Sequence, residues 1–512
     1  MASPKLQTSP TRLFVGDTTY GLALVLVVLL VFMNKKSRRA LRFPPGPPAW
    51  PLVGHLPLLG GRPHVRFAEW SRRYGPVLGV RLGPQQVVVL NGYAAVREAL
   101  VTKAEVFSSR PDLYLMRLFS NGKGIGLAPY SAKWRAQRRV TDRALRNLGV
   151  GKLSFEPKIM EEVEEFISAA ARYEGAAFDP KYHIAVGILN IICHLVFGRR
   201  FEHDDPLFVR LYNALEDISH HGGSAQHLNV FPALRHVPGL NAGAVHTVRA
   251  VREGRDFVRE MIGQHKATFD PENIRDYIDA YLHQLQKETE DGEKKSATYL
   301  SDEELEQNVF DLFIAGSEST ATTLRWATLL LLVNPEVQER VQQELDAVLG
   351  QGQASVLDRT SLPYTQATIQ EILRYRPSAT FSLPHATTAD TTLQGYDIPA
   401  GTQVLVNVYG MGMDPALWQH PGTFDPTRFL DGEGKLSVPE HFKPFLVGRR
   451  ACIGSQLAKM QLLLYITTVL QRFSLRLPEG EPPPSLDGSL GVMLQCPSFR
   501  MCAVPRAVTS SC

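Results

Sequence analysis

Residues 444–454, with the sequence Pro-Phe-Leu-Val-Gly-Arg-Arg-Ala-Cys-Ile-Gly, constrain this chain more than any other stretch. They predict a loop that leads into a buried helix, because the residues that follow are mostly apolar. Gly448 and Gly454 allow tight turns and the close approach of a flat ligand. The N-terminus of the helix favours a thiolate at Cys452, and Arg450 adds a cation that can pair with an anionic substituent. This arrangement predicts a cysteine that gives its charge to a metal and leaves the opposite face open.

Five positions of this stretch, Phe445, Gly448, Arg450, Cys452 and Gly454, match the pattern Phe-x-x-Gly-x-Arg-x-Cys-x-Gly. At typical residue usage, five fixed positions recur by chance in roughly one window in a few million. The stretch resembles the haem-thiolate loop of the cytochrome P450 family. The resemblance implies haem b as the cofactor, Cys452 as the ligand that donates electron density to the iron, and the other four residues as haem-binding. For a lone cysteine, a buried structural role is the alternative.

Composition and charge give no indication of a nucleic-acid-binding protein or of a disulfide-rich protein. The chain has 512 residues and a formal net charge of +4, which gives no reason to expect nucleic acid as a partner. Its five cysteines show no paired spacing, which favours a reducing compartment without disulfides. No repeat or long low-complexity linker divides the chain. The resemblance therefore predicts a single, mainly helical cytochrome P450 fold with a smaller β region.

Residues 1–42 predict an N-terminal, single-pass membrane anchor. Residues 18–34 carry no charged side chain and are largely aliphatic, near the lower length limit for a membrane-spanning helix. A basic cluster follows, which favours an anchor over a cleaved signal peptide and keeps the body of the chain in the cytosol. Residues 43–50 then predict a stiff proline-rich hinge, and residues 51–512 the catalytic domain. By resemblance to microsomal members of the family, we expect the protein at the endoplasmic reticulum membrane.

A basic segment around residue 134 predicts a helix with two roles. Trp134 and Arg138 lie four residues apart and share a helix face, and the resemblance implies that both donate hydrogen bonds to a haem propionate. The other basic residues form either a solvated face or, as electrostatic steering predicts, the docking face for an acidic redox partner. The resemblance implies that this partner is an NADPH-dependent reductase, with cytochrome b5 as a further partner. These other basic residues are Lys133, Arg135, Arg139, Arg143 and Arg146.

Residues 301–333 predict a long helix that ends before the next proline, with Ser301 opening a capping box. Residues 315–320 (Ala-Gly-Ser-Glu-Ser-Thr) interrupt its apolar pattern and predict a kink or a functional groove. This segment resembles the oxygen-binding groove of the family. The resemblance implies that Glu318 and Ser319 are catalytic and deliver protons, although Ser319 stands where threonine is usual. A buried polar kink is the structural alternative.

Two further motifs lie downstream. Glu371 and Arg374 share a helix face, and such a pair alone is weak evidence of function. The resemblance adds Arg428 and implies a structural triad that supports the haem loop. It also implies that His385 meets the second propionate. Gln461 stands where the family commonly has glutamate.

Apolar segments predict a lipophilic substrate pocket, and several local features are expected around it. Asp311 is expected to point away from the pocket. The pocket is expected to be lined by residues 113–119, Phe310, Phe313, Ile314, Ala315, and residues 379–382 and 490–493. We expect a β-hairpin in residues 77–90, irregular structure in 111–126, a pocket roof or a membrane-entering loop in 228–240, and a solvated loop in 287–295.

The resemblance is to the animal microsomal branch that includes drug-, aryl-hydrocarbon- and steroid-oxidising enzymes. It implies a membrane-anchored monooxygenase that inserts one oxygen atom of O₂ into a lipophilic substrate, with electrons from the NADPH-dependent reductase. Steroids, fatty acids and xenobiotics all remain open as substrates. One alternative is a haem-thiolate isomerase or dehydratase, against which Glu318 and Ser319 argue. The other is a membrane-anchored haem-binding or scaffold protein without turnover.

Overall fold

The computed structural model describes residues 41–290 and 299–506. The apolar run of the expected anchor lies outside these described residues. Within them, no helix is both long and apolar enough to cross a membrane. The chain divides after Phe43 into two units, and the second unit, Pro44–Cys512, contains the described helices and strands.

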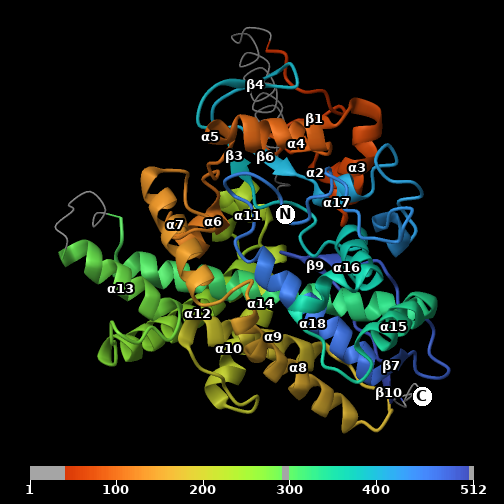
Figure 1. Cartoon of the computed structure of the whole chain (residues 1–512). Coiled ribbons are helices and arrows are strands. Elements are labelled where there is room, and N and C mark those ends of the chain that lie inside the picture. Colours follow the sequence, from red (N-terminus) through yellow and green to blue (C-terminus); the bar gives the residue numbers. More distant parts are fainter. Residues whose placement is uncertain (1–40, 291–298, 507–512) are drawn as a thin grey trace, which may run out of the picture. The chain divides into compact units, whose positions relative to one another are not determined.

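The second unit is mainly helical with a smaller β component, as the sequence predicts (Figure 1). Its N-terminal half contains α2 (Leu56–Leu59), α3 (Pro63–Tyr74), α4 (Tyr93–Arg97), α5 (Ala104–Phe107), α6 (Tyr114–Ser120), α7 (Ala132–Asn147), α8 (Glu156–Ala171), α9 (Lys181–Phe197), α10 (Pro206–Ser224), α11 (His227–Val230) and α12 (Ala242–Ala267). The C-terminal half contains α13 (Tyr277–Glu290), α14 (Asp302–Val333), α15 (Pro335–Leu349), α16 (Pro363–Tyr375), α17 (Val408–Gly412) and α18 (Ser455–Arg472). A π-helical turn, Glu98–Thr102, follows α4 directly.

The largest sheet has four strands in the order β1-β2-β6-β3. The expected hairpin is confirmed, because β1 (Val77–Leu82) pairs antiparallel with β2 (Gln85–Leu90). β6 (Gln403–Val406) runs parallel to β2, and β3 (His385–Ala386) pairs with the far edge of β6. This pairing places His385 at the end of the sheet. The two-stranded sheets are β4 (Thr391–Leu393) with β5 (Tyr396–Ile398), β7 (Phe473–Arg476) with β10 (Cys502–Pro505), and β8 (Ser489–Leu490) with β9 (Leu494–Gln495).

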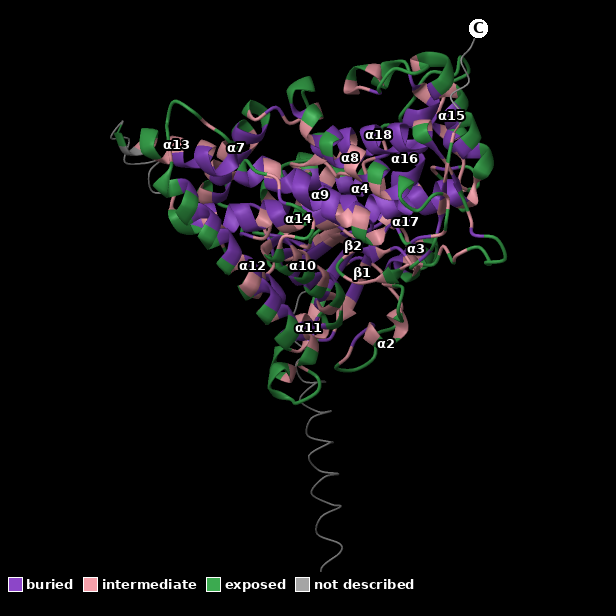
Figure 2. Cartoon of the chain, turned by 90° about the horizontal axis from the view of Figure 1, so that it is seen from below, coloured by how far each residue is buried: buried purple, intermediate pink, exposed green. Residues whose placement is uncertain are grey.

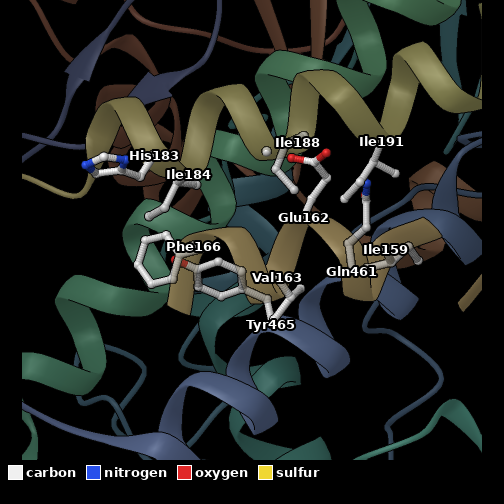
Figure 3. A pocket seen from close by; sticks show the side chains of 11 residues that line it. Ile159, Glu162, Val163, Phe166, His183, Ile184, Ile188, Ile191, Gln461 and Tyr465 are labelled. Atoms are coloured by element: carbon white, nitrogen blue, oxygen red, sulfur yellow. The ribbon is translucent and has the colours of Figure 1, made fainter. Parts of the chain in front are cut away.

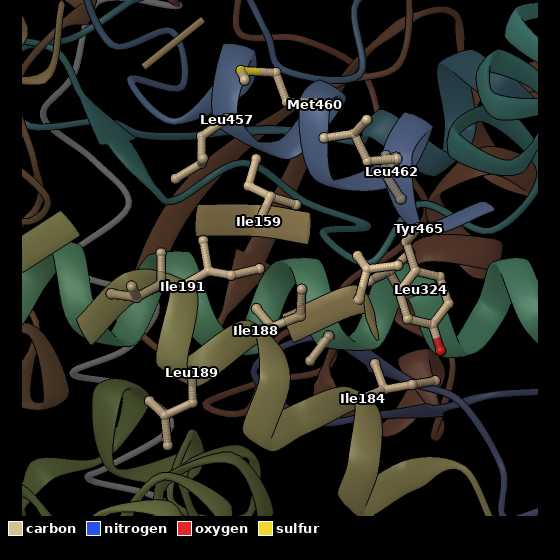
Figure 4. Close-up of a cluster of buried hydrophobic side chains, with 14 of the residues drawn as sticks. Ile159, Ile184, Ile188, Leu189, Ile191, Leu324, Leu457, Met460, Leu462 and Tyr465 are labelled. Carbon is tan, nitrogen blue, oxygen red and sulfur yellow. The ribbon is translucent and has the colours of Figure 1, made fainter. Parts of the chain in front are cut away.

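The core is built around α9, which packs against α8 and α14 and is apolar on nearly all its faces. Buried residues concentrate along α9, α14 and α18 (Figure 2). Side chains of α8, α9 and α18 face one another there (Figure 3). Leu324 of α14 joins the same cluster (Figure 4). Burial of this apolar surface provides the main driving force that holds the long helices together.

α14 begins and ends where the sequence predicts. The Ser301 hydroxyl accepts the Glu304 N–H (3.3 Å), so the serine caps the helix. Glu304 does not complete the capping box, because its carboxylate accepts the Gly124 N–H (2.9 Å) instead. The helix ends at Val333, two residues before a proline that disfavours helical geometry in the residue preceding it.

Two segments expected to be irregular are helical in part, and residues 291–295 of the second lie outside the described residues. Residues 111–126 contain α6, because Leu115 is buried against Leu228 and the start of α12. The charged run expected as a loop from residue 287 is helical as far as Glu290. In the last turn of α13, Gln286 donates to Glu290 (2.7 Å), and contacts between side chains four residues apart stabilise a helix.

Residues 228–240 place apolar side chains on both the inside and the outside of the fold. Leu228 faces inward and is buried against α6. Val237 and Leu240 face outward, with 41% and 49% of their surface exposed. The segment therefore covers the interior and at the same time presents apolar side chains to the outside.

Candidate active site

Cys452 lies in the loop that leads into α18, as the sequence predicts. Its N–H donates to the Phe445 carbonyl (3.0 Å), which closes the loop, and Gly454 is the N-cap of α18. Burial raises the pKa of the Cys452 thiol, while the Gly454 N–H and the charge of Arg138 act against that rise. Although protein surrounds it closely enough to raise this pKa, Cys452 keeps an exposed surface. The residue is therefore accessible although protein atoms surround its thiol.

The two glycines of the loop serve different purposes. Gly448 has a φ of +80°, and an added Cβ would lie 1.9 Å from the Leu100 carbonyl oxygen. The positive φ and this close approach to the protein backbone both require glycine here. Gly454 has an ordinary φ of −85°. A Cβ there would lie 4.0 Å from the Cys452 Sγ, an ordinary van der Waals contact, so the backbone conformation does not require glycine at this position.

Trp134 and Arg450, 316 residues apart in the chain, stack on one another. The Arg450 Cζ lies 3.9 Å from the centroid of the Trp134 ring, a cation–π contact. Arg450 donates to the carbonyls of Ser108 (2.8 Å) and Ala128 (2.6 Å). Both Arg450 (3.2 Å) and the Trp134 Nε1 (2.9 Å) also donate to the Ile125 carbonyl. The expected pair of cofactor-binding residues is therefore brought together beside the loop that precedes α7.

Arg138 and His385 complete the expected cluster. The Arg138 Nη2 donates to the Ala451 carbonyl (2.6 Å), one residue before Cys452. The His385 Nδ1 is 2.9 Å from the Phe107 carbonyl oxygen. Because a carbonyl can only accept, Nδ1 carries the proton of this ring. Burial, followed by the charge of nearby arginines, lowers the pKa of His385 to about 3, so the ring is neutral.

Arg110 belongs to the same cluster and was missed in the sequence. Its Nη1 donates to the carbonyls of Leu383 (3.1 Å) and Pro384 (3.0 Å), and its Nε donates to Gly126 (3.1 Å). A single arginine before Pro111 carries no motif or periodicity that could have identified it. Its proximity to His385 follows only from the bridge that joins Ser109 to Ala386.

Arg110, Arg138 and Arg450 form a cluster of positive charge. Burial and then Arg138 lower the pKa of Arg110 to about 9. Burial, followed by the other two arginines, lowers the pKa of Arg450 to about 8. Within the described residues, none of the three forms an ion pair with a carboxylate. Buried charges of this kind require an anionic partner. The two propionates of a haem would supply that charge, so the residues present fit the cofactor that the resemblance implies.

One face of α14 looks toward this cluster, and of the residues expected to line the pocket it carries Ala315 but neither Phe310 nor Phe313. Phe310 and Phe313 are both buried, and Phe313 contacts Phe197 of α9 and Phe257 of α12. Phe310 likewise meets α12, at Gly254. The expectation that these two rings line the substrate pocket is therefore wrong. Apolar character alone cannot distinguish a core face from a pocket face.

Asp311 does not point away from the site. The helix repeat places it on the same face as Ala315 and Glu318, and Ala315 is exposed within the fold. The carboxylate of Asp311 accepts the N–H groups of Ile125 (2.9 Å) and Gly126 (2.8 Å). Burial raises its pKa to about 6 against the effect of these hydrogen bonds. Asp311 thus joins α14 to the loop that also holds Trp134 and Arg450.

Glu318 and Ser319 are turned apart. The Ser319 hydroxyl donates to the Ala315 carbonyl (2.7 Å). Glu318 Oε1 accepts hydrogen bonds from Gln495 Nε2 (2.9 Å) and from Thr322 Oγ1 (3.3 Å). α14 remains continuous through this segment. Gly316, in the same segment, allows α14 to pack closely against α9. A Cβ on Gly316 would lie 2.5 Å from the Ile192 side chain of α9.

The triad expected beneath the loop is present. Arg374 donates to both carboxylate oxygens of Glu371, through Nε (2.6 Å) and Nη2 (2.7 Å). Arg428 donates through Nε to the same carboxylate (3.1 Å). The side chains of Glu371 and Arg374 are fully buried. Arg374 also donates to the Gly412 (2.6 Å) and Pro421 (2.9 Å) carbonyls, so the triad connects α16 to the chain that precedes the cysteine loop.

Gln461 lies away from this cluster. It faces a void of about 10 Å³ between α8, α9 and α18, together with Tyr465, Glu162 and His183 (Figure 3). A void of this size holds about one water molecule and no substrate. None of the residues that line it belongs to the cluster around Cys452. The void therefore belongs to the core of the protein.

Comparison with known proteins places these features in a family. Residues 44–503 match the family model for cytochrome P450. The chain is 38% identical over 491 residues to cytochrome P450 2D6 of Homo sapiens, with 94% of this chain and 97% of the relative covered. It is 38% identical over 505 residues to the vitamin D(3) 25-hydroxylase of Sus scrofa (96% and 100% covered). It is 37% identical over 487 residues to cytochrome P450 18a1 of Drosophila melanogaster (94% and 90% covered). The chain therefore belongs to the cytochrome P450 family, whose members are monooxygenase oxidoreductases.

Proposed function

We propose that this protein is a haem-thiolate monooxygenase that inserts one oxygen atom of O₂ into a lipophilic substrate. The observation that carries the proposal is the juxtaposition of the exposed residue Cys452 with three arginines, Arg110, Arg138 and Arg450, that form no ion pair with a carboxylate among the described residues. A metal ligand and an anion-binding cluster side by side are what a haem with two propionates requires.

Cys452 would hold the iron of haem b, and Trp134, Arg138, Arg450 and His385 would hold its propionates. When bound, this group supplies the activation of O₂ and the one-electron chemistry of the reaction. To these expected residues we add Arg110 as a propionate-binding residue. Its guanidinium lies in the same cluster and, with Arg138, depresses the pKa of Arg450.

His385 would change its protonation state when a propionate binds. In the structure its one N–H is already donated to Phe107, so the neutral ring has no further donor. The charges of Arg110 and Arg450 add to burial in lowering its pKa. A carboxylate placed between these groups would neutralise that effect and favour the protonated ring. His385 would then donate from Nε2 to the propionate.

Glu318 and Ser319 would handle the protons that the reaction consumes. The Ser319 hydroxyl gives its hydrogen to the Ala315 carbonyl, and its oxygen can still accept a hydrogen bond. Within the described residues, Glu318 uses only Oε1 for hydrogen bonds, which leaves Oε2 available to exchange protons. Both residues lie on the helix that bears Ala315, the small residue exposed within the fold.

Apolar side chains that are exposed near the arginine cluster support a lipophilic substrate. Ala315 and Leu383 expose apolar surface near the arginine cluster, where Arg110 donates to the Leu383 carbonyl. One relative is named for the hydroxylation of vitamin D₃, which is itself lipophilic. Steroids, fatty acids and apolar xenobiotics are all compatible with these walls.

The electrons would come from an NADPH-dependent reductase, with cytochrome b5 as a further partner, at the endoplasmic reticulum membrane. Arg135, Arg139 and Arg143 are exposed on α7, which also carries Arg138 beside the cysteine loop. Membrane association is supported by the apolar run in residues 18–34 and by exposed Trp50 and Leu52, with 58% and 65% of their surface accessible. The anchor, the cytosolic orientation and the division into residues 1–42, 43–50 and 51–512 are parts of this proposal.

Reconstitution of the full chain with haem, the reductase and NADPH tests the proposal. A panel of steroids, fatty acids and apolar xenobiotics is first screened for shifts of the Soret band. We expect compounds that shift the band to increase NADPH consumption and to yield products that carry one added oxygen atom. Product formation without NADPH would support an isomerase or dehydratase instead. Binding without any turnover across the panel would support a haem-binding protein.

A further inference from the structure

Gln495 contacts Glu318 across 177 residues of sequence. It is the last residue of β9, in a two-stranded hairpin with β8 near the C-terminus. Its side-chain amide donates to Glu318 Oε1 (2.9 Å), the same oxygen that accepts from Thr322 (3.3 Å). Two donors on one carboxylate oxygen fix both the side-chain torsions and the direction of the other oxygen.

The backbone next to Gln495 is held on both sides. The Leu494 N–H donates to the Ser378 carbonyl (2.7 Å), and the Leu494 carbonyl accepts from Trp326 Nε1 (2.9 Å). Trp326 is fully buried and lies on α14, two turns after Glu318. The donor and the acceptor of the Gln495–Glu318 hydrogen bond are therefore both attached to the same helix. Such an arrangement orients a side chain in advance without a further loss of conformational freedom.

Glycine at position 488 brings the two strands of the hairpin close together. A Cβ on Gly488 would lie 2.7 Å from the Gln495 carbonyl oxygen and 2.8 Å from Trp326. The tip of the hairpin is held as well, since Gly491 approaches the Ser219 carbonyl near the end of α10. The position of Gln495 is thus determined by contacts with two helices.

We propose that Gln495 is a positioning residue, which holds the Glu318 carboxylate so that Oε2 alone is free to exchange protons. The inference rests on the proposed proton-handling role of Glu318 and extends it to a residue outside α14. Without the amide, the carboxylate could adopt other staggered rotamers, and the share of time spent in the productive one would fall. A hydrogen bond to a charged group is strong enough to shift such a population by on the order of tenfold.

The test replaces the amide with an apolar side chain of similar length, Gln495→Met. We expect the ratio of oxygenated product to NADPH consumed to fall by on the order of tenfold, with the excess electrons released as peroxide. Substrate affinity, measured from the Soret shift, should stay unchanged. Turnover driven by hydrogen peroxide should also be spared, because peroxide supplies its own protons. Gln495→Asn, whose amide is one methylene too short, should show the same pattern.

A matched control and a measurement independent of turnover complete the test. Gln286 also donates to a glutamate, Glu290 (2.7 Å), but on the exposed side of α13, so Gln286→Met should change nothing. Thermal unfolding is then measured for Gln495→Ala, Glu318→Ala and the double variant. If the two side chains interact, the double variant loses less than the sum of the two single losses.

The outcomes separate this inference from the function on which it rests. Additive unfolding losses, or unchanged coupling of NADPH to product in Gln495→Met while Glu318→Gln uncouples, would overturn the role of Gln495 and leave the proposed function standing. Full coupling in Glu318→Gln would remove Glu318 from the mechanism, and the inference about Gln495 with it. A fall in coupling for both variants, together with non-additive unfolding, supports the proposal.

Discussion

At the scale of single residues, the site combines positions that carry a recognisable spacing with positions that do not. Cys452 and Arg450 were identified because a short loop fixes their separation in the sequence. Arg110 lies in the same cluster as Arg450. It is brought there by strand pairing and loop contacts between segments that are distant in sequence. Such contacts leave no local pattern, so sequence reasoning had no means to find this arginine.

Ser319 allows a residue-scale prediction. Ser319→Ala should lower the ratio of oxygenated product to NADPH consumed, because positioned proton transfer is typically worth about 10²–10⁴-fold. Ser319→Thr should match or exceed the wild-type ratio, since a β-branched side chain holds its hydroxyl in fewer rotamers. The two variants are compared with the wild-type protein in one assay of NADPH, peroxide and product.

The structure also defines what would contradict this prediction. Ser319 Oγ donates to the Ala315 carbonyl, a bond that hydroxyl side chains commonly form within helices. If that bond were its whole role, Ser319→Ala would keep full coupling and change only the unfolding temperature. Thr320 or a water molecule would then relay the proton.

At the scale of helices and loops, α14 shows how far an apolar pattern can be interpreted. Its start, its end and its polar centre were all predictable, since caps, prolines and breaks in periodicity are local signals. Which apolar face meets the core was not predictable, because Phe310 and Phe313 are as hydrophobic as any pocket lining. Asp311 was expected to point away from the pocket but does not, because its carboxylate accepts hydrogen bonds from a neighbouring loop.

The triad on α16 provides a prediction at this scale. Glu371→Ala should prevent stable haem incorporation, because it leaves Arg374 as a fully buried charge without its carboxylate. Breaking a buried pair of this kind costs about 3–5 kcal/mol, a large part of a stability of roughly 5–15 kcal/mol. Haem content per protein and the unfolding midpoint measure the effect.

Glu69 offers a matched control for the triad. It pairs with Arg66 at the same i, i+3 spacing (2.8 Å), but both side chains are 48% exposed. Glu69→Ala should therefore cost at most about 1 kcal/mol and leave haem content unchanged. Equal effects of the two substitutions would show that burial of the Glu371 pair has no special importance.

At the scale of the whole molecule, the basic face of α7 is the surface proposed for the reductase. We leave Lys133 out of this surface, because it forms an ion pair with the buried Glu304 carboxylate (2.6 Å). Reversing Arg135, Arg139 and Arg143 to glutamate should raise the KM for the reductase and weaken its dependence on salt. Peroxide-driven turnover should be spared, because it bypasses the partner.

The control for this prediction alters charge elsewhere. Arg210, Arg249 and Arg252 are exposed cations on α10 and α12, and their reversal changes the net charge by the same amount. The KM for the reductase should rise far less in this variant. A similar rise in both variants would mean that overall charge governs the encounter, and a loss of peroxide-driven turnover would mean that the α7 substitutions damage the haem site.

The central claim is that Cys452 supplies the thiolate ligand of a haem, and the spectrum of the reduced carbonyl complex tests it most directly. In the wild-type protein, the strong electron donation of a thiolate should shift the Soret band of this complex to the long wavelength typical of haem-thiolate proteins. Cys452→Ser, measured at equal haem content, should lose that shift. A Cys452→Ser protein that retained the wild-type spectrum would contradict the claim.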